Sequence, residues 1–366
     1  MVVDASVQSA VRGWCPSAHA PMQTGDGWIV RARVGCRVVD AHQWSAVADL
    51  AESEGNGLVE LTMRGNVQVR GVGERRTAAA ARRLMECGLA GSDEASDRRR
   101  VVVVNPLAAN GTGGGAALDL SVSEAAVLAS MEDLLERTCG RLPPKWWAIV
   151  DSGAAWPMPI AGCDVAVRYE DDEWHVIVAG RSWIRAADPL PSVLAIADRC
   201  ATEHVRARDL ALRSANAASD ARMGWWGVRT TDGIVAVHVA PPFGVMQAAD
   251  ARLLAALSAE SVSTRPTPER GVLLVTEPDR SDLVRDLVGD LATRGWIVAG
   301  DDPRRLVSTC IGNRGCGAAH VDTWAVAAGL AAGDRMHVSG CVKRCGAPGD
   351  VRELVATVDG LVEWPT

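Results

Sequence analysis

The sequence of this 366-residue chain repeats itself, and the repeat constrains the possible fold more than any other feature. Residues 25–34 (GDGWIVRARV) and 231–240 (TDGIVAVHVA) each contain an Asp-Gly turn followed by alternating apolar residues. This pattern is typical of a turn that leads into a half-buried strand. Stretches rich in Ala and Leu, which favour helices, follow at 41–53 and 247–259. Each half of the chain is therefore predicted to begin with a strand and then a helix.

Two further matches keep the same spacing of 206 residues. The strand-like stretches 61–70 and 268–276 carry Arg-Gly pairs in register, and DRRRVVVV at 97–104 corresponds to DPRRLVST at 303–310. Three elements at one constant offset indicate a duplicated unit, because unrelated strand–helix patterns would not share a single spacing.

The duplication predicts an α+β chain of four pieces. Each half has a front piece, strand–helix–strand, and a mixed α/β back piece. We expect the two front pieces to pair about a pseudo-two-fold axis and to leave a cleft between the back pieces, a common position for a ligand site. Amphipathic packing helices are expected at 121–138 and 192–213. The predicted boundaries of the four pieces are 1–90, 97–215, 222–295 and 300–366.

Four cysteines near the end of the chain form two close pairs, Cys310 with Cys316 and Cys341 with Cys345. Structural zinc sites usually use a gap of two to four residues within a pair, and the first gap here is wider. An iron–sulfur cluster accepts more varied spacing, and nearby glycines let backbone amides approach its sulfides. The pattern favours a [4Fe–4S] cluster, with zinc or no metal as the alternatives.

The bulk properties exclude several classes of function. A net charge of −7 is no indication of nucleic acid or of an anionic membrane surface as partner. The sequence has no apolar run of about 20 residues and no signal peptide, so a cytoplasmic location is expected.

The other six cysteines are scattered along the sequence, and we expect them to be buried and to pack as small hydrophobic residues. Lys145 and Lys343 are the only lysines among 38 lysines and arginines, which suggests a specific need for lysine at both positions.

The cysteine pattern, in the second half of a duplicated chain, resembles the siroheme-dependent sulfite and nitrite reductase superfamily. RGNVQVRG (64–71) looks like the Arg-bearing strand of that superfamily, and LPPKWW (142–147) looks like its Lys-bearing loop. The resemblance implies two ferredoxin-like half-domains related by a pseudo-two-fold axis and two mixed α/β domains. It also implies that all four cysteines bind a [4Fe–4S] cluster, the last one bridging to the siroheme iron in the reductases.

Two departures favour a different branch of this superfamily. Trp147 stands where sulfite reductases have the second Lys of Lys-x-Lys, and Val342-Lys343-Arg344 stands where they have Pro-Asn. An indole cannot neutralise sulfite, but it can pack against a large ring. Five segments look instead like the precorrin-3B synthases: RGWCP (12–16), GDGWIVR (25–31), LPPK (142–145), STCIGNRGC (308–316) and HVSGC (337–341).

The resemblance to precorrin-3B synthases implies an oxidoreductase, a monooxygenase of cobalamin biosynthesis. Its substrates would be the tetrapyrrole precorrin-3A and dioxygen, with hydroxylation at C20 and formation of a γ-lactone. It would carry the [4Fe–4S] cluster and a mononuclear non-haem iron, and it would use an electron donor that the sequence does not identify. The alternatives are a siroheme- and [4Fe–4S]-dependent sulfite or nitrite reductase and a non-catalytic tetrapyrrole- or cluster-binding protein.

The candidate site residues divide by chemistry. Guanidinium groups bind carboxylates in bidentate fashion. Two runs of arginines, at 98–100 and 304–305, occupy matching places in the two halves, and one arginine of each run is expected to reach the cleft. His337 is expected beside the cluster, as a hydrogen-bonding residue or as an iron ligand, and His19 is a weaker candidate for that iron. The predicted substrate-binding residues are Arg64, Arg70, Arg100, Trp147, Arg270 and Lys343, and the predicted catalytic residues are Lys145 and His337.

Overall fold

The computed structural model describes most of the chain, and several short stretches lie outside the described residues. None of the helices in the described part combines the length and the apolarity that crossing a membrane requires. The described residues are 15–98, 101–107, 122–137, 141–143, 145–151, 156, 158–171, 173–180, 182–207, 227–231, 234–330, 335–347 and 351–364.

The first front piece is a sheet with helices on one face. Its strands run in the order β1-β2-β4-β3-β12, and all neighbours are antiparallel. The helices α2 (Ala41–Ser53) and α3 (Thr77–Glu86) pack on this sheet, and a short helix, α4 (Glu94–Arg98), follows them. The strands are β1 (Met22–Thr24), β2 (Gly27–Ala32), β3 (Leu58–Leu61), β4 (Val67–Val72) and, from the second half, β12 (Val245–Gln247).

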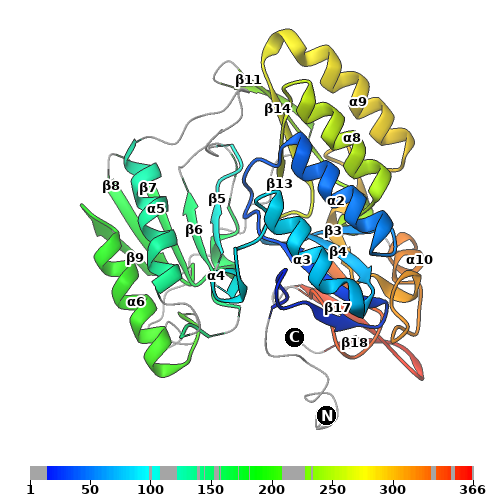
Figure 1. Cartoon of the computed structure of the whole chain (residues 1–366), viewed down its shortest axis with the longest axis horizontal. Helices are drawn as coiled ribbons and strands as arrows, with labels where there is room; N and C mark the ends of the chain where they lie inside the picture. Colours follow the sequence, from blue (N-terminus) through cyan, green and yellow to red (C-terminus); the bar gives the residue numbers. More distant parts are fainter. Residues whose placement is uncertain are drawn as a thin grey trace.

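The second front piece repeats this plan. Its antiparallel strands run in the order β10-β11-β14-β13, and the helices α8 (Ala248–Ala259) and α9 (Ser281–Thr293) cover one face. Figure 1 shows α2 and α3 beside α8 and α9 on the same part of the molecule. The strands are β10 (Gly227–Thr231), β11 (Ile234–Val239), β13 (Ser263–Pro266) and β14 (Val272–Thr276).

The two front pieces exchange backbone pairing. β12 from the second half completes the first sheet by pairing with β3. In return, the Val39 N–H donates to the Thr264 carbonyl on β13 at 3.0 Å. The indole N–H of Trp44 on α2 also donates to the Thr264 hydroxyl, at 2.6 Å. These contacts occur on corresponding elements of the two halves, as expected of a pseudo-two-fold pair.

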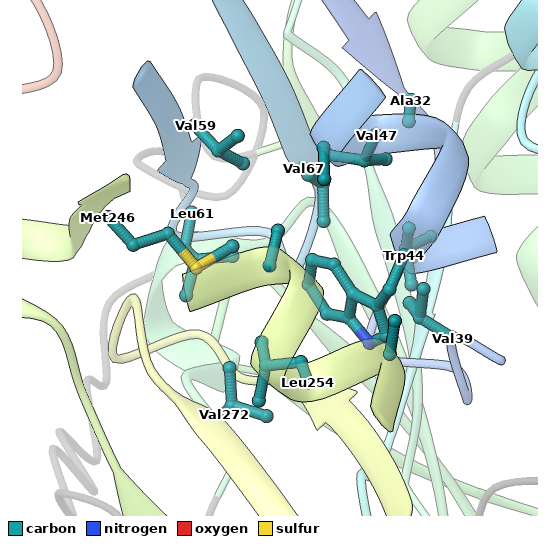
Figure 2. Packing of buried hydrophobic residues seen from close by; sticks show 14 of the residues in the cluster. Ala32, Val39, Trp44, Val47, Val59, Leu61, Val67, Met246, Leu254 and Val272 are labelled. Atoms are coloured by element: carbon teal, nitrogen blue, oxygen red, sulfur yellow. The ribbon is translucent and has the colours of Figure 1, made fainter. Parts of the chain in front are cut away.

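A single apolar core joins the two halves. Trp44 is fully buried, and Figure 2 shows side chains from both halves around it, among them Val67 from β4 and Leu254 from α8. Matching caps begin the two central helices: Asp40 and Gln43 form a capping box at α2, and Gln247 and Asp250 form one at α8. The duplication is therefore visible both in the core and in the helix starts.

The back pieces are two smaller mixed sheets. In one, β5-β6-β7-β8-β9, strands β5, β6 and β7 are parallel neighbours and α5 and α6 cover one face. Figure 1 shows this unit at one side of the molecule. Its elements are β5 (Val102–Val104), α5 (Val122–Arg137), β6 (Ala148–Asp151), β7 (Val165–Glu170), β8 (Glu173–Val178), β9 (Ser182–Ala186) and α6 (Leu190–Glu203).

The other sheet has the order β15-β16-β17-β18, with β15, β16 and β17 parallel and β18 antiparallel. Its elements are β15 (Val307–Thr309), α10 (Thr323–Ala328), β16 (Met336–Ser339), β17 (Arg352–Thr357) and β18 (Gly360–Trp364). The 3₁₀ helices of the described residues are Glu74–Arg76, Ile160–Gly162, Pro242–Gly244, Pro278–Arg280, Pro303–Leu306 and Gly312–Arg314.

The two front sheets differ on the face opposite their helices. On the second sheet this face carries Ala236, Leu273 and Val275, which pack in one apolar cluster with Ile149 and Ile177 of the first back piece. On the first sheet, the corresponding strands β2, β3 and β4 carry polar and charged side chains: Arg31, Glu60, Gln68 and Arg70. The duplicated scaffold therefore presents one polar sheet face.

The predicted architecture, an internally duplicated α+β fold, is confirmed by these sheets. Two details of the prediction were wrong. The stretch 61–70 is not one strand, because a tight turn from Thr62 to Asn66 separates β3 from β4. The stretch 268–276 likewise begins in a turn.

The spacing of the repeat is also not constant. α8 begins 207 residues after α2, whereas β13 begins 205 residues after β3, because the connections between the elements differ in length. The helix predicted at 192–213 ends early, at Glu203, where His204 adopts a left-handed conformation and closes the helix.

Candidate functional site

The four cysteines meet because of strand order. Cys310 directly follows β15, and Cys341 and Cys345 follow β16. β15 and β16 are parallel neighbours, so their carboxyl ends lie at the same sheet edge. The Cys310 N–H donates to the Val338 carbonyl at 3.1 Å, and the Gly340 N–H donates to the Cys310 sulfur at 3.1 Å. The two cysteine pairs, far apart in sequence, are thus brought to one place.

The thiols also influence the pKa values of Cys310 and Cys345, as groups that lie near one another do. Burial raises the pKa of Cys310, and the nearby Cys341 and Cys316 raise it further, against backbone N–H groups that lower it. Cys345 as a residue is exposed, yet burial of its thiol raises its pKa to about 11, and the other three thiols raise it further. Thiols that disfavour each other's ionisation release their protons when a metal binds, because the metal charge stabilises the thiolates.

The four cysteine thiols are the donors that this site offers to a metal group. Among the described residues, no group of three or more His, Cys, Asp or Glu side chains is arranged to bind a single metal ion. Four cysteines on neighbouring segments, with an amide N–H directed at the Cys310 sulfur, are the type of donor set that an iron–sulfur cluster uses.

Glycines from both halves make room around the cysteines. A Cβ atom on Gly25, in the turn between β1 and β2, would lie 2.6 Å from the Cys316 sulfur and 2.8 Å from the Gly317 nitrogen. Gly25 also accepts a hydrogen bond from the Gly317 N–H at 3.2 Å. A Cβ on Gly340 would lie 2.7 Å from Ala319. The first half of the chain therefore forms part of the wall around the cysteines of the second half.

His337 lies on β16 and is fully buried. Its Nδ1 pairs with the Ser308 hydroxyl at 2.8 Å. Burial lowers its pKa to about 3, as do the charges of Arg270 and Arg344, while the backbone of Cys345 opposes the shift. His337 is therefore neutral near pH 7 and available as a hydrogen-bonding ring beside the cysteines. His19 contacts the Gly91 carbonyl through Nε2 at 2.8 Å, in the N-terminal loop.

Residues between the second pair of cysteines have different surroundings. Lys343 is exposed. Arg344 has a left-handed backbone, forms an ion pair with the buried Glu353 at 2.5 Å and lies over the Trp364 ring at 5.0 Å. Glu353 also accepts a hydrogen bond from Ser339 at 2.7 Å. Arg344 therefore anchors the Cys341–Cys345 turn to strands β17 and β18.

Arg64, Lys145 and Trp147, predicted from separate motifs, lie together. Arg64 donates to the Lys145 carbonyl at 2.8 Å, and its guanidinium lies 5.3 Å from the centre of the Trp147 ring. Trp147 is only 5% exposed and donates to the Gly162 carbonyl at 2.9 Å. Lys145 is exposed and has a left-handed backbone. Arg64 lies in the β3–β4 turn, not on a strand as the sequence indicated.

Burial lowers the pKa of Arg64 to about 10, and the nearby charges of Arg31 and Arg206 add to this effect, against Cys15 and Asp164. Arg70 is different, because it pairs with Asp26 at 2.9 Å and with Glu60 at 2.8 Å. The charge of Arg70 is thus compensated within the protein, whereas that of Arg64 is crowded by other cations. Arg100 lies outside the described residues, and Arg304 pairs with Asp302 at 2.6 Å.

Arg31 is a candidate site residue that the sequence did not single out. It lies opposite Gln68 in the β2–β4 pair and donates to the Gln68 amide oxygen at 2.9 and 2.7 Å. The group that accepts these two hydrogen bonds is therefore neutral, on the polar sheet face beside Arg64. Its position in the first repeated strand, one residue from apolar neighbours on each side, was the available signal.

The polar sheet face adjoins the cysteines. A Cβ on Gly315 would lie 3.4 Å from the Asp26 carboxylate. Arg70 is among the charges that act on Cys345, and Glu60 is among those that act on Arg270. A continuous series of charged groups therefore runs from the Lys145–Trp147 loop across the first sheet to the cysteine segments.

Arg270 lies between the two cysteine segments. Its Nη1 donates to the Thr309 carbonyl at 3.2 Å and its Nη2 donates to the Gly346 carbonyl at 2.9 Å. Arg270 is 8% exposed. The residues that it contacts directly precede Cys310 and follow Cys345, so the structure brings Arg270 to the cysteines rather than to Arg64.

Comparison with known proteins gives a consistent assignment. Residues 20–87 match the nitrite/sulfite reductase ferredoxin-like half domain. A protein from Sinorhizobium sp. named precorrin-3B synthase is 26% identical over 389 aligned residues, covering 94% of this chain and 80% of that protein. The structure of the Mycobacterium tuberculosis NirA protein superposes with a TM-score of 0.64 at 18% identity, covering 92% of this chain and 73% of NirA. The chain thus contains a nitrite/sulfite reductase ferredoxin-like half domain, shares the fold of NirA and resembles a precorrin-3B synthase over most of its length.

Proposed function

We propose that this chain is a precorrin-3B synthase, which hydroxylates precorrin-3A at C20 with dioxygen and closes a γ-lactone with the ring A acetate. The observation that carries the proposal is the meeting of four cysteines beside an arginine-bearing sheet face, in a chain that resembles a protein of that name. The reaction takes one oxygen atom of dioxygen into the substrate and releases the other as water. It consumes two electrons and two protons, supplied by an electron donor that is not identified.

Arg31 and Arg64 are the groups best suited to bind the carboxylates of the substrate. Arg31 donates to the Gln68 amide oxygen and Arg64 donates to the Lys145 carbonyl, and both acceptors are neutral, whereas Arg70 is paired with two carboxylates. A substrate carboxylate would relieve the crowding of positive charge around Arg64. Trp147 acts through Arg64, since the indole is buried beneath the guanidinium.

The cysteines Cys310, Cys316, Cys341 and Cys345 would hold a [4Fe–4S] cluster, which supplies one-electron transfer when bound. The neutral His337 is placed to accept or donate a hydrogen bond beside that group, and the exposed Lys343 is free to meet a substrate carboxylate. The donor set for a mononuclear iron is not found among the described residues, so no step is assigned to such an ion.

The optical spectrum of anaerobically purified protein is the first test. A broad shoulder in the blue region without haem bands supports the proposal, whereas a siroheme spectrum would instead support a sulfite or nitrite reductase. The second test is turnover of precorrin-3A with reductant and labelled dioxygen. One labelled oxygen atom in the product supports the synthase. Binding of precorrin-3A without turnover, in protein with a full cluster and a competent reductant, would point to a binding protein.

Replacing Cys345 by Ser should remove most of the iron and acid-labile sulfide, because one of the four proposed ligands is lost. The matched control is Cys87→Ala, which changes a buried cysteine at the end of α3, outside the cysteine segments. Iron and sulfide analysis of both variants after anaerobic reconstitution gives the result. Unchanged iron and sulfide in Cys345→Ser would rule out this ligand set.

A further inference from the structure

The turn that carries Arg270 has a counterpart in the first half of the chain. In the β3–β4 turn the Gly65 N–H donates to the Thr62 carbonyl at 2.9 Å, and in the β13–β14 turn the Arg270 N–H donates to the Thr267 carbonyl at 3.1 Å. The φ angle is 58° at Gly65 and 57° at Arg270. Glycine suits this left-handed conformation, whereas a residue with a Cβ is disfavoured there. An arginine at the glycine position of the repeat therefore indicates a role for its side chain.

The surroundings accommodate this side chain closely. A Cβ on Gly244 would lie 2.6 Å from the Cβ and 2.9 Å from the Cδ of Arg270. A Cβ on Gly346 would lie 3.1 Å from the Arg270 Nη2. Both glycines have a positive φ, 78° and 76°. The Arg270 side chain therefore passes two glycines, Gly244 and Gly346, on its way from the second sheet to the cysteine segments, and a side chain at either position would crowd it.

The two hydrogen bonds of Arg270 join segments that are distant in sequence. Thr309 ends β15 and is followed by Cys310, and Gly346 directly follows Cys345. One planar guanidinium thus joins the segments of the first and the last of the four cysteines, through hydrogen bonds to two backbone carbonyls. A lysine has a single point of attachment and would not span the two carbonyls in the same way.

The charge of Arg270 is buried without an ion pair in the described part of the chain. Burial lowers its pKa, and the charges that oppose this effect are those of Glu60 and Cys310. Glu60 is already paired with Arg70. A buried cation needs a nearby anion, and thiolates bound to a metal cluster beside Cys310 would provide one.

We propose that Arg270 is a positioning residue that ties the Cys310 and Cys345 segments together and places a positive charge next to the cluster. The tie is a property of the polypeptide alone. The effect of the charge rests on the proposed function, because it requires the cluster. This role replaces the substrate contact that the sequence predicted for Arg270.

Hydrogen exchange of the metal-free, full-length protein tests the tie. The key variant is Arg270→Gly, because it restores the residue that the first repeat has at this position and relieves the backbone, so that it is expected to fold. Amide exchange near Cys310 and near Cys345 should both become at least about fivefold faster, while exchange in α2 and α8 stays unchanged. Arg64→Gly is the matched control, since it removes the arginine next to Gly65 in the corresponding turn.

The outcome at the two segments decides the inference. Faster exchange at both segments in Arg270→Gly, and at neither in Arg64→Gly, supports the tie. Faster exchange at one segment only, or at none, overturns it. If Arg270→Gly does not fold, Arg270→Ala serves in its place, with the same expectation, because it removes both hydrogen-bond donors and keeps a Cβ at this backbone position.

The reduction potential of the reconstituted protein tests the charge. Arg270→Lys keeps the cation and should retain a potential near that of the wild type. Arg270→Gly removes the cation and should shift the ratio of reduced to oxidised cluster at least tenfold toward the oxidised form, which is about 59 mV for one electron. Equal potentials in the two variants overturn the electrostatic part. If the wild type binds no cluster, the proposed function fails, while the exchange experiment still tests the tie.

Discussion

Gly25 is the residue at which the first half of the chain most directly limits the shape of the cysteine site. Its Cβ position lies 2.6 Å from the Cys316 sulfur, and the nearest backbone nitrogens at 2.8 and 2.9 Å belong to the same segment. Its φ is not in the left-handed region, so an alanine would be opposed by contact and not by backbone conformation. Glycine is therefore required at position 25 because a Cβ atom would collide with the Cys316 segment, and not because of its φ angle.

We predict that Gly25→Ala displaces Cys316 and reduces the iron and sulfide bound after reconstitution by at least about half, while the protein remains folded. Gly289→Ala is the control, because nothing lies within 4 Å of a Cβ at that helical position. There alanine should stabilise α9 by roughly 0.5–1 kcal/mol. Full metal content in Gly25→Ala would show that the Cys316 segment can shift without harm.

His238 gives a prediction about pH. It is fully buried on β11, pairs with Thr267 at 2.9 Å, and meets the Trp156 ring edge to face at 4.8 Å. Burial lowers its pKa to about 3, and the charge of Arg305 adds to this effect. The unfolded chain therefore binds the proton first, and this site loses stability as the pH falls below the unfolded pKa of about 6.5.

Replacement of His238 by Gln should remove this pH dependence. The variant is expected to be less stable than the wild type near neutral pH, because the site is closely packed. Between about pH 7.5 and about pH 4.5 this difference should shrink by about 3 kcal/mol. Urea unfolding at several pH values measures the change, and His337 contributes equally to both proteins. A difference that stays constant over this pH range would contradict the buried, neutral state of His238.

At the scale of elements, α10 is held to the first cysteine segment through its cap. The Asp322 side chain accepts from the N–H groups of Trp324 and Ala325 at 3.0 and 3.2 Å. It also pairs with Arg314, which lies between Cys310 and Cys316 and stacks on the Trp324 ring at 4.7 Å. A single carboxylate thus serves both as a helix cap and as a contact to the segment.

Replacing Asp322 by Ala should cost about 1–2 kcal/mol in unfolding free energy, mostly through the lost cap. Asp322→Asn retains a capping oxygen but loses the charge opposite Arg314. Because this ion pair is solvent-exposed, the Asn variant should lose less than about 1 kcal/mol. Chemical denaturation of the two variants separates the contributions. Equal losses would mean that the charge, and not the cap, is what matters.

Across the whole molecule, the two halves form one cooperative core. Trp44 from α2 is surrounded by side chains of both halves, and its indole donates to Thr264 on β13. Trp44→Ala should therefore cost about 3–5 kcal/mol. Trp44→Phe should cost less, because it keeps most of the apolar contact and gives up mainly one hydrogen bond, worth about 1 kcal/mol.

The measurement is thermal unfolding combined with hydrogen exchange on β4 and β14, one strand from each half. In Trp44→Ala both strands should lose protection to the same extent, because they share the core. Loss of protection confined to β4 would indicate that the halves unfold separately.

The sequence predicted much of this architecture because the evidence was local or periodic. Alternating apolar residues after Asp26-Gly27 indicated a strand, and the bounds of α2 were predicted correctly as 41–53. The repeated order of elements led to the duplicated fold. Hairpin turns were missed, because Arg64-Gly65 and Arg270-Gly271 look like parts of a strand when only hydrophobic alternation is considered.

The sequence alone determined that four thiols form two close pairs, that the chain is duplicated, and that lysine occurs only at positions 145 and 343. Only the tertiary structure decided what lies beside those thiols. Corresponding positions of the two sheets carry Arg31 and Gln68 in the first half but His238 and Leu273 in the second, where an apolar cluster covers them. Which duplicated face is covered depends on contacts between distant segments, and local sequence patterns do not record such contacts. For the same reason Arg70 is neutralised by Asp26 and Glu60, whereas Arg270 reaches the cysteines.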